Sequence, residues 1–154
     1  MLYFAYGSNM AAGEIGAWTD QHRFLGPARL DGYRLGLMRR SIRWGAGVLD
    51  LVAAPGAAVW GALYELPDES LARLDEKEGA GFAYRRIEVE PVIDGARRAA
   101  VAYEVIDKEP EEVPCAPEYA AGVLAGARER GLPDAYVREL ERGLAPPDAG
   151  ITRP

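Results

Sequence analysis

Residues Tyr6-Gly7-Ser8-Asn9 stand between a short aromatic segment and a segment with helical character. A glycine in such a turn lets backbone N–H groups come close to a ligand, and the unpaired donors of a following helix suit a carboxylate or a phosphate. The alternative interpretation is structural: Gly7 makes the turn, and Ser8 or Asn9 caps the helix. The loop matches neither the phosphate-loop nor the dinucleotide-binding fingerprint.

Glu78 places a carboxylate where the helical pattern predicts an apolar side chain. Leu71 and Leu74 mark the buried face of a helix predicted over residues 68–78, and Glu78 follows them on that same face. A carboxyl group held at such a helix end suits general acid–base chemistry near neutral pH. The alternative is that Glu78 reaches into water from a frayed helix end.

Tyrosine hydroxyls can fix a small polar ligand, although a strand tyrosine more often packs in the core with its hydroxyl at the rim. The candidates of this kind are Tyr3, Tyr6, Tyr84, Tyr103 and Tyr119. The sequence also contains pairs of arginines, which are predicted at solvated strand or loop positions. These pairs are Arg39-Arg40, Arg85-Arg86 and Arg97-Arg98.

The composition excludes several classes of function. The 18 basic residues against 24 acidic ones give a net charge of −6, which argues against a nucleic-acid partner. Cys115 and His22 are the only residues of their kinds, so no internal disulfide and no His/Cys metal cluster are expected. We therefore predict chemistry on carboxylates, hydroxyls and backbone amides, with no metal and no cofactor.

The length of 154 residues, with 49% of them hydrophobic, predicts a single domain with a sizeable core. No apolar run approaches the ~18 residues of a membrane span, and the first residues lack the basic region of a signal peptide. We therefore expect a cytoplasmic protein with no membrane partner.

Short strands and longer helices must position these residues. Strands are predicted over residues 2–6, 33–38, 47–52, 59–66, 84–92 and 98–106, and helices over 10–18, 68–78, 117–130 and 134–142. Pro55-Gly56 predicts a turn between two of the strands, Asp94-Gly95 a hairpin, and Gly79 the end of a helix. Strands fill the middle and helices the end, which favours an α+β fold with a mixed sheet over a doubly wound one.

Two segments together resemble the gamma-glutamylcyclotransferase family. Residues 3–10 (YFAYGSNM) resemble its opening motif, and residues 74–79 (LDEKEG) resemble its catalytic segment. The opening motif fits the branch that acts on gamma-glutamyl amino acids better than the glutathione-specific branch. Further matches are Trp44, Gly47, Val59-Trp60-Gly61, Pro117-Glu118-Tyr119, Gly131-Leu132-Pro133 and Tyr136.

The resemblance implies a mixed β-barrel with flanking helices over residues 1–144, followed by an irregular tail at residues 145–154. It implies that Glu78 is the catalytic acid–base residue. It also implies that the substrate is held by Tyr6, Gly7, Ser8, Asn9, Tyr84 and Tyr119. The family includes homodimers. Residues 39–43 depart most from the family pattern, and this leaves the preferred leaving group open.

The implied reaction converts a gamma-glutamyl amino acid into 5-oxoproline and the free amino acid. The α-amine of the substrate attacks its own γ-carbonyl, so the protein needs no nucleophile of its own. Two alternatives stay open. One is a related enzyme that acts on gamma-glutamyl amines, and the other is a non-catalytic module that binds a small carboxylate.

Overall fold

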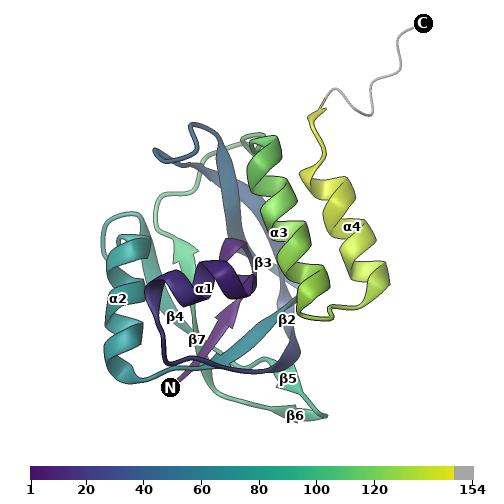
Figure 1. Cartoon of the computed structure of the whole chain (residues 1–154). Helices are drawn as coiled ribbons and strands as arrows, with labels where there is room; N and C mark the ends of the chain where they lie inside the picture. Colours follow the sequence, from purple (N-terminus) through teal and green to yellow (C-terminus); the bar gives the residue numbers. More distant parts are fainter. Residues whose placement is uncertain (148–154) are drawn as a thin grey trace, which may run out of the picture.

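The computed structural model describes residues 1–147, which form one sheet flanked by helices (Figure 1). The strands are β1 (Leu2–Ala5), β2 (Arg23–Arg40), β3 (Gly47–Glu65), β4 (Tyr84–Val89), β5 (Val92–Ile93), β6 (Ala96–Arg97) and β7 (Ala100–Val105). The helices are η1 (Ser8–Met10), α1 (Ala12–Trp18), α2 (Asp68–Glu78), α3 (Pro117–Glu129) and α4 (Asp134–Leu144). From residue 148 onward, the predicted tail lies outside the described residues.

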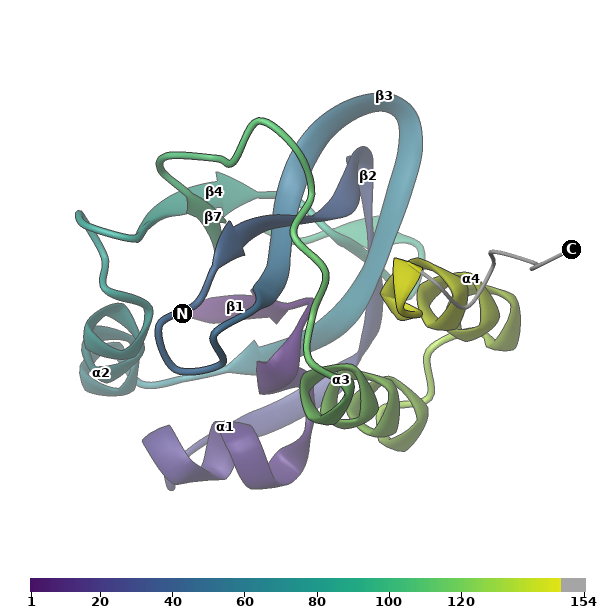
Figure 2. The same ribbon diagram turned by 90° about the horizontal axis from the view of Figure 1, so that it is seen from above.

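The sheet has seven strands in the order β4-β7-β1-β3-β2-β5-β6. β1 pairs with β7 in parallel, and the other neighbours are antiparallel, so the sheet is mixed. The long strands β2 and β3 curl, and Figure 2 shows β3 as an arch that turns the sheet into a partial barrel. The predicted α+β class and the barrel-like sheet with flanking helices are therefore confirmed.

The prediction of short separate strands at 33–38, 47–52 and 59–66 is wrong. β2 and β3 contain 18 and 19 residues and pair along their length. Between the pairs Asp31–Ala58 and Tyr33–Ala53, residues 54–57 of β3 face a single residue of β2, so Pro55-Gly56 forms a bulge. Such a bulge bends a strand without reversing it, and the predicted turn is a bend inside one strand.

Other predicted boundaries hold because local signals fix them. α2 covers Asp68–Glu78, and Gly79 ends it in the left-handed conformation with φ +62°. Asp94 and Gly95, with φ of +51° and +76°, form the predicted hairpin between β5 and β6. The first predicted helix is divided into η1 and α1, because Ala11 between them is extended.

The core fixes the two segments that carry the predicted site. β1 lies inside the sheet, and Phe4 is fully buried there. Gly61 of β3 allows close packing, since a Cβ atom at this position would lie 2.4 Å from the Ala5 carbonyl oxygen. Leu71 and Leu74 bury one face of α2, which places the end of this helix beside the loop that follows β1.

Candidate active site

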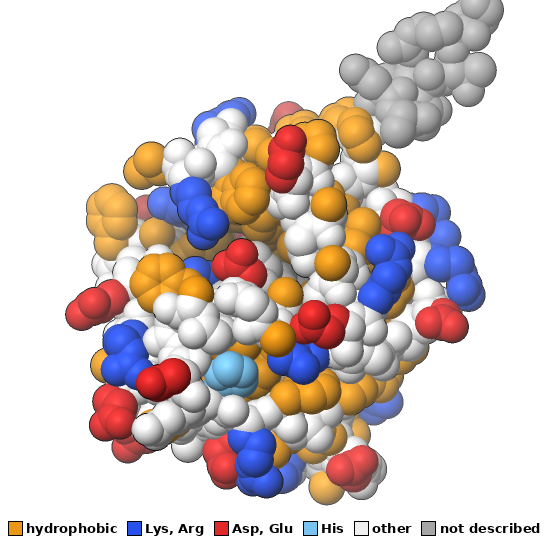
Figure 3. Space-filling model, viewed as in Figure 1, with side chains coloured by type: hydrophobic (Ala, Val, Ile, Leu, Met, Phe, Trp, Pro, Cys, Tyr) orange, Lys and Arg blue, Asp and Glu red, His pale blue; other side chains and the backbone are white. Residues whose placement is uncertain are grey.

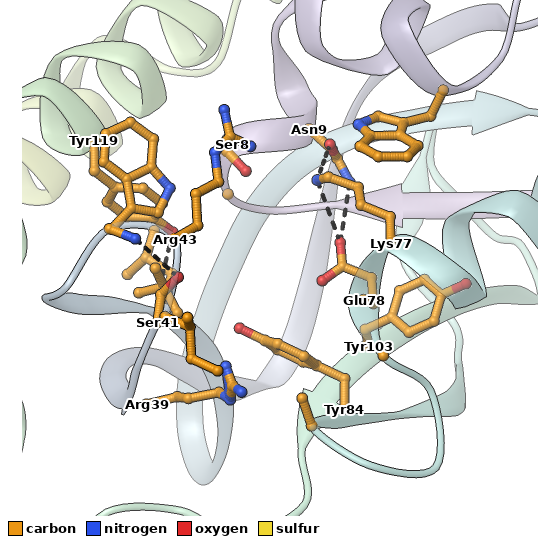
Figure 4. A pocket seen from close by; sticks show the side chains of 18 of the residues that line it. Ser8, Asn9, Arg39, Ser41, Arg43, Lys77, Glu78, Tyr84, Tyr103 and Tyr119 are labelled. Atoms are coloured by element: carbon orange, nitrogen blue, oxygen red, sulfur yellow. Dashed lines mark hydrogen bonds and ion pairs between the residues drawn. The ribbon is translucent and has the colours of Figure 1, made fainter.

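One pocket brings together all the residues that the sequence singled out as a site. It has a volume of about 430 Å³. Its lining comes from strands β1, β2, β3, β4 and β7, from helices η1, α1, α2 and α3, and from the turn between β2 and β3. The predicted members of this lining are Tyr6, Gly7, Ser8, Asn9, Glu78, Tyr84 and Tyr119. Figure 4 shows the pocket from close by, and Figure 3 shows charged and apolar side chains around a hollow on this face.

Asn9 is buried and connects β1 to α2. Its Nδ2 donates to the Tyr3 hydroxyl at 3.0 Å and to Glu78 Oε1 at 3.2 Å. Its Oδ1 accepts from Lys77 Nζ at 2.7 Å. Neither η1 nor α1 has a side-chain cap, so the alternative that Ser8 or Asn9 serves as a helix cap is wrong.

Lys77 determines how the Asn9 amide is oriented. An ammonium group can only donate hydrogen bonds, so the Asn9 carbonyl oxygen must face Lys77. The Nδ2 protons of Asn9 then point to Tyr3 and Glu78. Lys77 Nζ also lies 3.6 Å from Glu78 Oε1, and its side chain is only 12% exposed.

The two oxygens of the Glu78 carboxylate have different surroundings. Oε1 is held by the Asn9 amide and the Lys77 ammonium. Within residues 1–147, Oε2 takes part in no hydrogen bond or ion pair, and Figure 4 shows it on the side of the open pocket. The side chain is 18% exposed at a helix end closed by Gly79, so Glu78 does not lie at a frayed end in water.

Two pocket tyrosines are tied to the backbone of neighbouring strands. The Tyr6 hydroxyl donates to the Tyr103 carbonyl at 2.6 Å, and the Tyr119 hydroxyl accepts from the Leu49 N–H at 2.9 Å. Burial raises the pKa of both phenols above the usual value for tyrosine. Both hydroxyls are therefore protonated at neutral pH, where they can position a ligand but cannot act as bases.

Figure 4 shows the Tyr84 ring below Glu78, between this carboxylate and Arg39. Burial raises the pKa of this phenol, the negative charge of Glu78 raises it further, and the nearby Arg39 lowers it. The guanidinium carbon of Arg39 lies 5.8 Å from the centre of the Tyr84 ring.

Sequence reasoning missed part of the pocket wall. Arg39 was expected at a solvated position, and the structure places it in the pocket because β2 curls toward α2. Lys77 carries no signal in the helical pattern, since its role depends on the contact with Asn9. Tyr3 and Tyr103, which the sequence offered as candidate ligand-binding tyrosines, also line the pocket. Other lining residues had no site role in the sequence, among them Trp18, Arg43 and Trp44.

Among residues 1–147, no group of three or more His, Cys, Asp or Glu side chains is placed to hold a metal ion. In the same part of the chain, no helix combines the length and the apolar character needed to cross a membrane.

Comparisons with known proteins agree on one family. The family model for "Gamma-glutamyl cyclotransferase, AIG2-like" matches residues 3–122. The chain is 32% identical to gamma-glutamylcyclotransferase of Bos taurus over 145 residues, which cover 90% of this chain and 76% of that protein. It is also 32% identical to gamma-glutamylcyclotransferase of Homo sapiens over 146 residues, with 91% and 77% covered.

The fold agrees with the sequence comparison. A solved structure of a gamma-glutamyl cyclotransferase superimposes with a TM-score of 0.88 at 30% identity, covering 96% of this chain and 89% of the other. The family match includes both the loop after β1 and the end of α2, which meet in the pocket. The chain therefore belongs to the gamma-glutamyl cyclotransferase family of enzymes, as the resemblance predicted.

Proposed function

We propose that this chain converts a gamma-glutamyl amino acid into 5-oxoproline and the free amino acid, with Glu78 as the acid–base residue. The observation that carries the proposal is the asymmetric fixation of Glu78. Asn9 and Lys77 hold Oε1, which leaves Oε2 available to a substrate amine in the pocket. A carboxylate fixed in this way suits repeated proton transfer. A site that only bound an anionic ligand would gain nothing from a carboxylate facing that ligand.

The substrate supplies the nucleophile. Its α-ammonium loses a proton to Glu78, and the resulting amine attacks the γ-carbonyl carbon. The bond between that carbon and the leaving nitrogen then breaks, while the new carbon–nitrogen bond closes a five-membered ring. Overall, the attacking nitrogen loses two protons and the leaving nitrogen gains two, so no water and no co-reactant is consumed.

The remaining predicted residues would hold the glutamyl part. The N–H groups of Gly7, Ser8 and Asn9 begin a short helix, where the first donors have no partner within the helix. We propose that they bind the α-carboxylate of the substrate or the oxygen of the attacked carbonyl. Tyr6, Tyr84 and Tyr119 would shape the pocket so that the chain folds back for ring closure.

A panel of gamma-glutamyl substrates tests this function. The panel contains gamma-glutamyl-alanine, gamma-glutamyl-ε-lysine and glutathione, and the readout is 5-oxoproline. Release from gamma-glutamyl-alanine is the expected result. Release from gamma-glutamyl-ε-lysine alone would instead favour an enzyme for gamma-glutamyl amines. Binding of 5-oxoproline without turnover of any substrate would contradict catalysis and favour a binding module.

The resemblance also supports a cytoplasmic location, a role in glutathione metabolism, a homodimeric state and a domain that ends near Leu144. These features are part of the proposal. Light scattering coupled to size exclusion would test the dimer, and fractionation of the source cells would test the location.

A further inference from the structure

Two arginines form part of the pocket wall on the side away from Glu78. Arg39 lies at the end of β2, and Arg43 lies in the turn that joins β2 to β3 (Figure 4). Within the described residues, neither guanidinium forms a hydrogen bond or an ion pair with a carboxylate. Each packs on an aromatic ring instead: Arg39 on Tyr84 at 5.8 Å, and Arg43 on Trp44 at 5.3 Å.

Internal hydrogen bonds fix the turn that carries Arg43. Ser41 N–H donates to the Ala46 carbonyl at 2.9 Å, and Gly45 N–H donates to the Ser41 carbonyl at 2.8 Å. Trp44 N–H also donates to Ser41 Oγ at 3.3 Å. The backbone that carries Arg43 is therefore already ordered by hydrogen bonds. Binding a ligand at Arg43 then costs less conformational entropy than it would if the turn were flexible.

The charges of the pocket are divided between its two sides. Lys77 and Glu78 neutralise each other at 3.6 Å on the α2 side. Glu76 is the other acidic lining residue, and it also belongs to α2. The wall formed by β2 and its turn carries two positive charges with no acidic residue, although the whole chain has a net charge of −6.

We infer that Arg39 and Arg43 form a subsite for the leaving group, and that this subsite selects an amino acid with two carboxylates. The inference rests on the proposed function. Guanidinium groups bind carboxylates through two parallel hydrogen bonds, so two separate arginines match an α-carboxylate and a side-chain carboxylate. A leaving group with one carboxylate would leave one of the two arginines unpaired.

The position of the subsite follows from the reaction. The glutamyl part must place its α-amine at Glu78 and lie against the loop from Gly7 to Asn9. The leaving amino acid then extends toward the opening of the pocket, where Ile42 and Phe82 are 89% and 79% exposed. Arg43 is exposed beside Ile42 in the same turn, so it lies where a leaving group would be held.

The test compares gamma-glutamyl-glutamate with gamma-glutamyl-glutamine, which have nearly the same shape and differ by one negative charge. For the wild-type enzyme we expect kcat/KM to be about tenfold higher for the glutamate substrate, since a charge-assisted hydrogen bond is lost with glutamine. The ratio should fall toward one in the double variant Arg39→Gln, Arg43→Gln. It should also fall with added salt.

Arg40→Gln is the matched control. Arg40 is an exposed neighbour that donates to the Gly45 carbonyl at 3.2 Å and does not line the pocket, so its variant should keep the wild-type ratio. A wild-type ratio near one, or a ratio that survives in the folded double variant, would overturn the subsite. Turnover of gamma-glutamyl-alanine separates the two failures: if it persists, only the subsite is wrong, and if no substrate is turned over, the proposed function fails.

Discussion

At the scale of single residues, the pocket depends on one buried amide that connects three polar side chains. Asn9 donates to Tyr3 and Glu78 and accepts from Lys77, so all of its strong hydrogen-bonding groups are used. Removing one member leaves a polar group unpaired in a partly buried site, which is costly. The side chains of Asn9 and Lys77 therefore orient the Glu78 carboxylate.

We predict that Lys77→Met lowers kcat for gamma-glutamyl-alanine by about tenfold, because the Asn9 carbonyl and Glu78 lose their shared partner. Lys77→Gln retains a donor for Asn9 Oδ1 and should recover part of the loss. Steady-state kinetics of both variants, with circular dichroism as a check of folding, measure the effect. Equal activity of Lys77→Met and wild type would show that the lysine does not position Glu78.

At the scale of elements, the sequence predicted the helix boundaries that are set by residues next to them in the chain. α2 begins after Pro67 and ends at Gly79, and both positions have chemistry that marks a helix boundary. The bulge in β3 could not be predicted in this way, because Pro55-Gly56 is equally typical of a turn between two strands. The place of Arg39 in the pocket follows from the curl of β2, which depends on pairing with β3 over its length.

The contact between β1 and β3 gives a stability prediction at this scale. We expect Gly61→Ala to lower the free energy of unfolding by about 1–3 kcal/mol, since its methyl group would overlap the Ala5 carbonyl oxygen and the Phe4 ring. Gly122→Ala is the matched control. A Cβ atom at Gly122 meets no atom within 4 Å, and alanine there should stabilise α3 by roughly 0.5–1 kcal/mol.

Urea unfolding of both glycine variants measures these changes. If Gly61→Ala were as stable as wild type, β1 and β3 would not pack as closely as described.

At the scale of the whole molecule, the curled sheet gathers buried tyrosines from β1, β4, β7 and α3 around one pocket. The opening motif and the catalytic segment were recognisable in the sequence because their residues are contiguous. Their meeting in space was implied by the family resemblance alone, since it depends on the sheet order and on the burial of α2. The places of Arg39 and Lys77 in the pocket could not be predicted without that arrangement.

The buried phenols predict how stability depends on pH. Burial raises the pKa of Tyr3 and Tyr6 well above their ordinary value of 10.0. The unfolded chain releases these protons near pH 10, while the folded chain still holds them. The contribution to stability is therefore fully present below pH 10 and is lost as the pH rises toward the pKa of the folded state.

We expect the free energy of unfolding to fall steadily above about pH 10. Urea unfolding at a series of alkaline pH values measures it, and Tyr6→Phe should make the decline less steep. If stability declined as steeply in Tyr6→Phe as in wild type, the raised pKa of Tyr6 would not contribute to the pH dependence.

The most direct measurement of the role of Glu78 is 5-oxoproline release by Glu78→Gln and wild type, with Glu69→Gln as control. Glutamine keeps the size of the side chain but cannot carry the proton, and Glu69 is exposed on the first turn of α2. We predict that Glu78→Gln loses about 10²-fold or more in kcat, while Glu69→Gln keeps wild-type activity. A folded Glu78→Gln variant with wild-type turnover would contradict the assignment of Glu78 as the acid–base residue.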